Sequence, residues 1–241
     1  MRSNTGKVAL CHAQDHQRTV ILQQRSRNRI APNAFSGDGK TFLFVCDNGI
    51  CYWDVVNSTI VQPVAATVLS DTGEVVWMDV ERRHNTVAVV GQRQVCLVDL
   101  SHTTQPQTLS VEEVSYLRCK WNPIDSHTLA LSNPNRGVSL LDTRSLSIVE
   151  QLQCKNNSIR DMSFSCYGTY LAIATDKGTQ LWDLRKNRLV MQFGARGYHC
   201  TFSPTWNALV MATSPGWCNQ RDGVQLWRPN YATQEQSNKE V

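Results

Sequence analysis

The chain has 241 residues, of which 41% are hydrophobic and 18% charged, and its formal net charge is +4. This is the composition of a globular protein long enough to bury a sizeable core. The charge is small and no run of five or more lysines and arginines occurs, which argues against nucleic acid as a main partner. No stretch approaches the 18 apolar residues of a membrane-spanning helix, so no membrane association is predicted.

The first 29 residues hold two apolar runs, 7–13 and 18–25, that are predicted to form strands. Arg25, Arg27 and Arg29 follow at alternate positions, so an extended chain would present all three on one side. An acidic partner or a phosphate backbone could bind them there, but an ordinary solvated loop is the preferred interpretation.

The nine cysteines say more about the cellular compartment of the protein than about a catalytic or metal-binding role. Their number is odd, no pair has the C-x-x-C spacing, and several lie inside apolar runs such as "RQVCLVDL". Free cysteine packs as a small hydrophobic side chain. We therefore predict buried thiols in a cytoplasmic or nuclear protein, in preference to a disulfide framework or a zinc site.

A repeat organises the rest of the chain. Five segments end alike, as "GICYWDV", "RQVCLVDL", "GVSLLDTR", "GTQLWDLR" and "GVQLWRPN", and their spacing is 45, 43, 41 and 45 residues. The position before the usual aspartate is Trp53, Val98, Leu141, Trp182 and Trp227, and the following residue is Asp54, Asp99, Asp142, Asp183 and, in the last copy, Arg228. Such a period indicates repeated structural units.

Each unit divides into four short strands. In the fourth copy the strands are predicted to end at Phe164 and to cover 170–175, 179–183 and 188–193, with the turn sequences "SCYG", "DKG" and "LRKN" between them. Four antiparallel strands in about 43 residues correspond to one blade of a β-propeller. The sequence thus predicts an all-β fold with at least five blades.

The repeat resembles that of the WD-repeat β-propeller family over residues 30–229, with third strands ending near 54, 99, 142, 183 and 228. The chain departs from the family pattern in two ways. The Gly-His pair that often opens a repeat is absent, with only His199 near such a place, and most copies lack the aspartate between the second and third strands. Blade packing is therefore expected to come mainly from apolar strand faces.

The blades of a β-propeller close into a ring, and the sequence allows more than one way for this chain to do so. The fifth copy ends after its third strand, and the polar segment 230–241 is predicted to be disordered. In the family, an N-terminal strand pairs with the last blade, and residues 18–25 would do so here to give five blades. However, 7–13 then resembles a strand of a further blade, and most family members have seven. A truncated chain, or a partial propeller completed by a partner, is an equal alternative.

Catalytic and cofactor motifs are absent from the sequence. There is no Gly-rich phosphate loop and no G-x-S-x-G or H-E-x-x-H motif. His12 and His16 are four apart in a region predicted to be strand and turn, where that spacing does not gather metal ligands. The "ERRH" run has Glu81 and His84 where phosphoinositide-binding propellers carry Phe and Gly. We predict a protein that is not an enzyme and binds no cofactor or metal.

Two consecutive copies carry an arginine two residues after the aspartate, giving Asp142 with Arg144 and Asp183 with Arg185. The carboxylates can accept amides of the following turn, and each arginine then pairs with its own or a neighbouring acid. Alternatively, the pairs are similar to the W-D-x-R boxes of substrate receptors of cullin-RING ubiquitin ligases, where the arginine contacts the adaptor. Arg185 matches that motif fully, whereas Leu141 precedes the aspartate of the Arg144 copy.

A second candidate surface lies where the innermost strands begin, which in this family is the usual recognition face. Aligning these strands places six residues there, Trp77, Arg118, Arg160, Asp161, Tyr198 and His199. Trp, Tyr and Arg are common interface anchors. The resemblance thus implies a protein-binding propeller and, more specifically, a ubiquitin-ligase substrate receptor. The alternative is a scaffold subunit of a chromatin, RNA-processing or trafficking complex.

Overall fold

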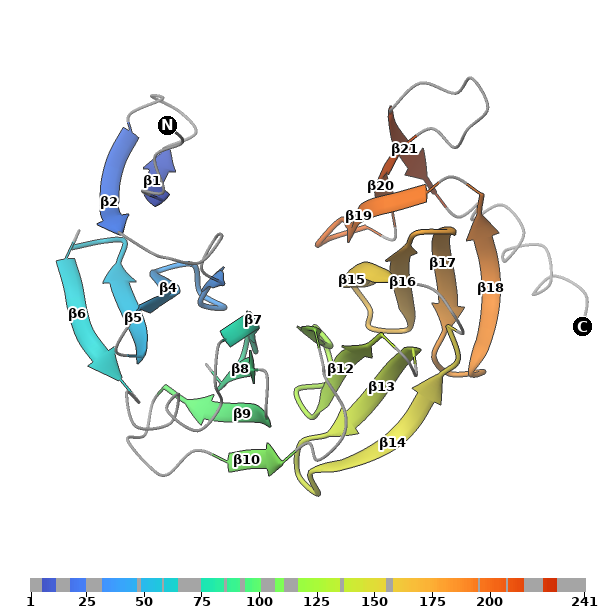
Figure 1. Ribbon diagram of the computed structural model, residues 1–241, viewed down its shortest axis with the longest axis horizontal. Coiled ribbons are helices and arrows are strands. Elements are labelled where there is room, and N and C mark those ends of the chain that lie inside the picture. The colour runs from blue at the N-terminus through green and yellow to red at the C-terminus, as the bar shows by residue number, and fades with distance from the viewer. Residues whose placement is uncertain are drawn as a thin grey trace, which may run out of the picture. The chain divides into compact units, whose positions relative to one another are not determined.

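The computed structural model describes residues 6–11, 18–24, 32–46, 49–57, 59–64, 75–84, 86–91, 94–100, 107–110, 117–134, 137–154, 158–194, 196–206, 208–214 and 223–228. Within these ranges the chain forms strands and turns and no helix, so no helix capable of crossing a membrane is found there (Figure 1). The chain divides into two compact units, Met1–Ser115 and Tyr116–Val241.

The first unit contains a hairpin and two four-stranded antiparallel sheets. The hairpin is β1 (Gly6–Cys11) with β2 (Arg18–Gln24). One sheet is β3 (Asn33–Phe35), β4 (Thr41–Cys46), β5 (Gly49–Asp54) and β6 (Thr59–Val64). The other is β7 (Val75–Val80), β8 (Thr86–Gly91), β9 (Gln94–Asp99) and β10 (Gln107–Ser110). Aliphatic side chains of β4, β7 and β8, among them Leu43, Val87 and Val89, form one core between the two sheets.

The second unit contains three antiparallel sheets in chain order. They are β11 (Arg118–Trp121), β12 (Thr128–Asn133), β13 (Gly137–Asp142) and β14 (Ser147–Leu152), then β15 (Ile159–Phe164), β16 (Tyr170–Thr175), β17 (Gly178–Asp183) and β18 (Arg188–Phe193), then β19 (Arg196–Phe202), β20 (Leu209–Ser214) and β21 (Gly223–Trp227). The last sheet therefore has three strands in the described part of the chain, and its third strand ends where the fifth copy of the repeat ends.

Strand β17 in the middle sheet of this unit is buried on both faces, and neighbouring residues of a strand point to opposite sides. Trp182 packs into the core shared with β12 and β13, which includes Ala130 and Leu140. The adjacent Leu181 packs into the core shared with β19 and β20, which includes Phe202 and Met211. Apolar strand faces thus hold the sheets together, as the sequence predicts.

Hydrogen bonds also join consecutive sheets. The Phe202 amide donates to Ser163 Oγ at 2.9 Å, and the Cys200 amide donates to Asp161 Oδ2 at 3.2 Å. At the other end of the sheets, Asn122 Nδ2 donates to the Gly168 carbonyl at 3.1 Å. Gly168 has a φ of 66°, and a Cβ there would lie 2.2 Å from Asn122 Oδ1, so this contact requires glycine.

One polar residue follows the first strand of every repeat and stabilises the next turn. The residues are Ser36, Glu81, Asn122, Ser165 and Ser203. The side-chain oxygens of Glu81, Asn122 and Ser203 accept two amides of the turn, and those of Ser36 and Ser165 accept the amide of the first residue of the next strand. The "ERRH" run is therefore a turn in which the buried Glu81 carboxylate bonds the amides of Arg83 and His84.

The cysteines are mostly as predicted, with one correction. Cys96, Cys119, Cys154, Cys166 and Cys200 are free thiols, and burial raises the pKa of Cys154 to about 12. Cys51 in β5, however, is disulfide-bonded, so the prediction of thiols throughout was wrong there. An odd count without C-x-x-C spacing argues against a framework of several bridges. It carries no information about a single pair that folding brings together.

Several predictions for the chain ends fall partly outside the described residues. The two N-terminal runs predicted as strands coincide with β1 and β2, which pair with each other. Ring closure by residues 18–25 stays a prediction. His12, His16, the three arginines of residues 25–29 and the segment 230–241 lie outside the described residues.

Candidate functional site

The two candidate surfaces lie at opposite ends of the sheets in the second unit, because successive strands are antiparallel. The first strands begin at one end, which we call the entry end. The turns from third to fourth strands lie at the other, which we call the rim. Five of the six predicted recognition residues lie at the entry end of this unit. Trp77 lies in β7 of the first unit, where it is partly buried, and is not part of the cluster described here.

A row of charged or ionisable side chains lies at the entry end. It consists of Arg118, Asp161 and His199, which occupy equivalent positions in β11, β15 and β19, three residues before the end of each strand. Asp161 Oδ2 is 3.3 Å from His199 Nδ1. Burial lowers the pKa of Arg118, and the charge of the nearby Asp161 carboxylate opposes that shift. We call Arg118, Asp161 and His199 the charged row. Its central carboxylate has cationic or ionisable neighbours on both sides.

The residues one position earlier form a second row. Arg160 and Tyr198 are each the extra residue of a β-bulge, because Ile159 and Asp161 pair with consecutive residues of β16, as Gly197 and His199 do with β20. Bulges redirect side chains relative to the sheet. The Arg160 guanidinium lies over the Tyr198 ring, with Cζ 4.7 Å from the ring centroid, which is a cation–π contact.

Leu117 occupies the equivalent position before β11, with 38% of its surface exposed, the same fraction as Tyr198. We call Leu117, Arg160 and Tyr198 the exposed row. Leu117 was not predicted, because the residues chosen from the aligned first strands were charged or aromatic and Leu117 is neither. The same alignment, read one position earlier in each copy, would have found it.

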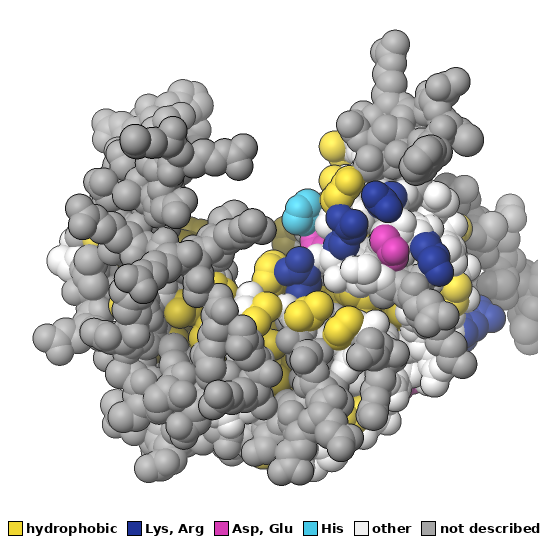
Figure 2. Space-filling view, viewed as in Figure 1, with side chains coloured by type: hydrophobic (Ala, Val, Ile, Leu, Met, Phe, Trp, Pro, Cys, Tyr) yellow, Lys and Arg dark blue, Asp and Glu magenta, His cyan; other side chains and the backbone are white. Residues whose placement is uncertain are grey.

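Further charges surround these rows. Figure 2 shows Lys, Arg, His and Asp or Glu side chains gathered on one face of the second unit. Lys177 in the β16–β17 turn and Arg196 at the start of β19 are both exposed. Arg196 Nε donates to the Asp176 carbonyl at 3.5 Å, and Asp176 Oδ1 accepts the Ser158 amide at 2.9 Å. Lys177, Asp176 and Arg196 were not among the predicted site residues.

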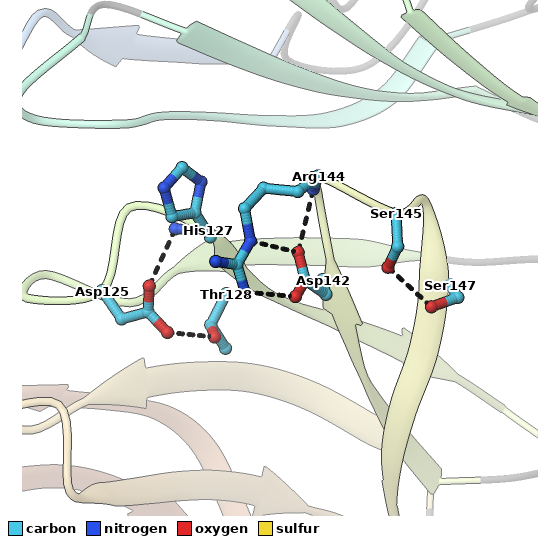
Figure 3. Close-up of polar contacts among 7 residues, drawn as sticks. All are labelled: Asp125, His127, Thr128, Asp142, Arg144, Ser145 and Ser147. Carbon is cyan, nitrogen blue, oxygen red and sulfur yellow. Dashed lines mark hydrogen bonds and ion pairs between the residues drawn. The ribbon is translucent and has the colours of Figure 1, made fainter.

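At the rim, the Arg144 side chain is bound by its own aspartate (Figure 3). Nη2 donates to Asp142 Oδ2 at 2.7 Å and Nε donates to Oδ1 at 3.1 Å, a two-pronged ion pair. The Arg144 amide also donates to Asp142 Oδ1, at 2.9 Å. The carboxylate of Asp125, which accepts the His127 amide and the Thr128 hydroxyl, adds a second favourable charge for Arg144.

The Arg185 side chain differs from that of Arg144, although its turn is the same. Asp183 is buried, and its Oδ1 accepts the amides of Arg185 and Lys186 at 3.0 and 3.2 Å. The guanidinium of Arg185 is exposed and makes no ion pair within the described residues. Asp54 binds the amides of Val56 and Asn57 in the same way. The aspartate of the repeat is therefore a turn-stabilising residue, whereas Arg185 has no such role.

A pH-dependent consequence follows for Asp142. The hydrogen bonds from the Arg144 guanidinium hold the pKa of Asp142 well below its usual range. The ionised pair therefore stabilises the fold above the unfolded-state pKa, and this contribution is lost as pH falls toward the folded-state value. We expect Arg144→Gln to raise the pKa of Asp142, measured by NMR titration of the carboxyl carbon, and Arg185→Gln to leave it unchanged. An unaltered pKa in Arg144→Gln would show that the turn amides alone lower it.

The described residues contain no cluster of three or more His, Cys, Asp and Glu side chains that could bind a metal ion. The charged row supplies one carboxylate and one imidazole, which is fewer ligands than metal sites in proteins use. The arrangement at the entry end instead combines a stacked guanidinium, an exposed aromatic ring and an exposed aliphatic side chain, the chemistry of a binding surface.

Comparison with known proteins establishes the fold. No protein-family model and no curated protein matches the sequence. Among solved structures, the chain is similar to one in "Crystal Structure of Mitotic Checkpoint Complex", with a TM-score of 0.76 and 16% sequence identity over 94% of this chain and 71% of that chain. Together with the antiparallel sheets of three and four strands, this likeness confirms the predicted all-β, WD-repeat type of β-propeller.

Proposed function

We propose that the chain is a non-catalytic protein-binding propeller that recognises a partner at the entry end of its second unit. The observation that carries this proposal is the Arg160–Tyr198 stack, which two bulges in neighbouring sheets place at equivalent positions. A half-buried Arg on an exposed Tyr costs little entropy to order on binding, since the stack already restrains both side chains. The predominance of free thiols among the described cysteines supports a cytoplasmic or nuclear protein.

More specifically, we propose a substrate receptor of a cullin-RING ubiquitin ligase, in which the rim contacts the adaptor and the entry end binds the substrate. The unpaired, exposed Arg185 guanidinium supports this proposal among the described residues, because the turn itself uses only the Arg185 amide. Arg144, bound by Asp142, would have to exchange that ion pair for one with the adaptor. We therefore expect Arg185 to contribute more than Arg144 to adaptor binding.

Affinity purification of the tagged chain from cells, followed by mass spectrometry, tests both levels of the proposal. Recovery of a cullin and its adaptor, with loss of both in Arg185→Glu, would support the receptor. Arg83→Glu is the matched control, since Arg83 is an exposed turn arginine in the first unit. Adaptor recovery at the wild-type level from folded Arg185→Glu would refute the rim contact. A stoichiometric complex without ligase components would favour the scaffold alternative.

A further inference from the structure

The charged row and the exposed row differ in what they leave for a partner. In the charged row the Asp161 carboxylate is fully engaged. Oδ1 accepts the Met162 amide at 2.9 Å, and Oδ2 accepts the Cys200 amide and contacts His199. Because these bonds tie β15 to β19, the acidic group at the centre of this end serves the packing of two sheets.

The exposed row leaves a cation without an acidic partner. Arg160 donates no hydrogen bond to a described residue, and its Nε is buried without an acceptor. The Arg160 guanidinium stacks on the Tyr198 ring. Such stacking leaves the N–H groups, which point outward in the plane of the guanidinium, without an acceptor. Its remaining donors are therefore available to an acceptor brought from outside, and leaving them unpaired is costly when the site is covered.

The surroundings add positive charge and compensate little of it. Lys177 and Arg196 are exposed near the same end, where the Asp161 carboxylate contacts His199 and lies near Arg118. The other carboxylate here, Asp176, accepts the Ser158 amide. The positive electrostatic potential at the entry end therefore favours a partner that carries negative charge.

Exposed apolar side chains occupy the positions equivalent to Arg160 in the two neighbouring sheets. Tyr198 and Leu117 are each 38% exposed and occupy equivalent positions in the sheets that follow and precede β15. A guanidinium stacked on an aromatic ring, with an exposed aliphatic side chain at the equivalent position of the next sheet, matches a ligand that carries a carboxylate next to an apolar group.

We propose that the exposed row binds a linear peptide segment of the partner protein in which an Asp or Glu stands next to an apolar residue. The carboxylate accepts hydrogen bonds from the Arg160 guanidinium, and the apolar side chain packs on Tyr198 or Leu117. This inference rests on the proposed protein-binding function and names the chemistry of its partner.

Selection of a displayed library of random linear peptides on the purified full chain tests this proposal. We expect the enriched peptides to share an acidic residue beside an apolar one. Synthetic copies of these peptides should bind Arg160→Gln and Tyr198→Ala at least about tenfold more weakly than the wild type, measured by fluorescence polarisation. Arg188→Gln, an exposed arginine on β18, is the matched control and should bind like the wild type. Circular dichroism confirms that each variant is folded.

The outcomes separate this inference from the broader function. Enriched peptides without acidic residues, whose binding is still lost in Tyr198→Ala, would overturn the acidic segment and leave the protein-binding entry end standing. Acidic peptides that bind Arg160→Gln as tightly as the wild type would also overturn it. If nothing is enriched, and the partners recovered from cells bind Arg160→Gln and Tyr198→Ala normally, both the inference and the proposed location of binding fail.

Discussion

Leu181→Ala is expected to lower the free energy of unfolding by about 2–5 kcal/mol. The Leu181 side chain is fully buried, between its own sheet and the next, against Ala172, Phe202 and Met211. Alanine would leave a cavity that both sheets line. Neither sheet can close it without disturbing hydrogen bonds such as that of the Phe202 amide with Ser163.

Urea denaturation monitored by tryptophan fluorescence measures this loss. Leu189→Ala is the matched control, because Leu189 lies on β18 with 41% of its surface exposed and the same number of carbon atoms is removed. The control should change the free energy of unfolding by less than about 1 kcal/mol. Equal losses in the two variants would mean that the interface between the second and third sheets of this unit contributes little to stability.

Gly137→Ala is expected to cost about 2–4 kcal/mol, because it combines backbone strain with a collision. Gly137 has a φ of 91°, in the region of backbone conformation that residues other than glycine rarely adopt. A Cβ there would lie 2.3 Å from the Leu152 carbonyl oxygen and 2.7 Å from the Cys154 amide nitrogen. Both are backbone atoms, one in the last residue of β14 and one just after it, so the chain at the end of this strand has to move.

The same denaturation experiment tests this second effect, with Gly194→Ala as its control. Gly194 follows β18, and a Cβ added there meets nothing within 4 Å. The control should therefore be neutral or slightly stabilising. A neutral Gly137→Ala would show that this turn rearranges without cost.

The blades could be predicted from the sequence because turn chemistry marks their boundaries. The aspartates of the first four copies coincide with the ends of β5, β9, β13 and β17. Local rules suffice for this: alternating apolar residues make the strands, and an aspartate beside Gly, Asn or Lys residues makes the turn.

The details of the binding surface could not be predicted in the same way. Arg160 and Tyr198 meet because each is an extra residue in a bulge, and one such residue decides which side of the strand a side chain occupies. Likewise, Arg144 and Arg185 follow the same aspartate, yet only Arg144 turns back to bind it. The nearby Asp125 carboxylate, on a different strand connection, favours that arrangement for Arg144. Such contacts depend on tertiary neighbours rather than on spacing.

The turn after each first strand shows what kind of constraint the repeat imposes. Serine occupies that position in three copies, asparagine in one and glutamate in one. Glu81, Asn122 and Ser203 accept the amides two and three residues on, whereas Ser36 and Ser165 accept the amide five residues on. The requirement is for an acceptor within reach, so residues of different size and charge are interchangeable there. At such positions the amino-acid sequence can therefore diverge while the fold is kept, because the fold requires a hydrogen-bond acceptor in the right place and not one particular residue.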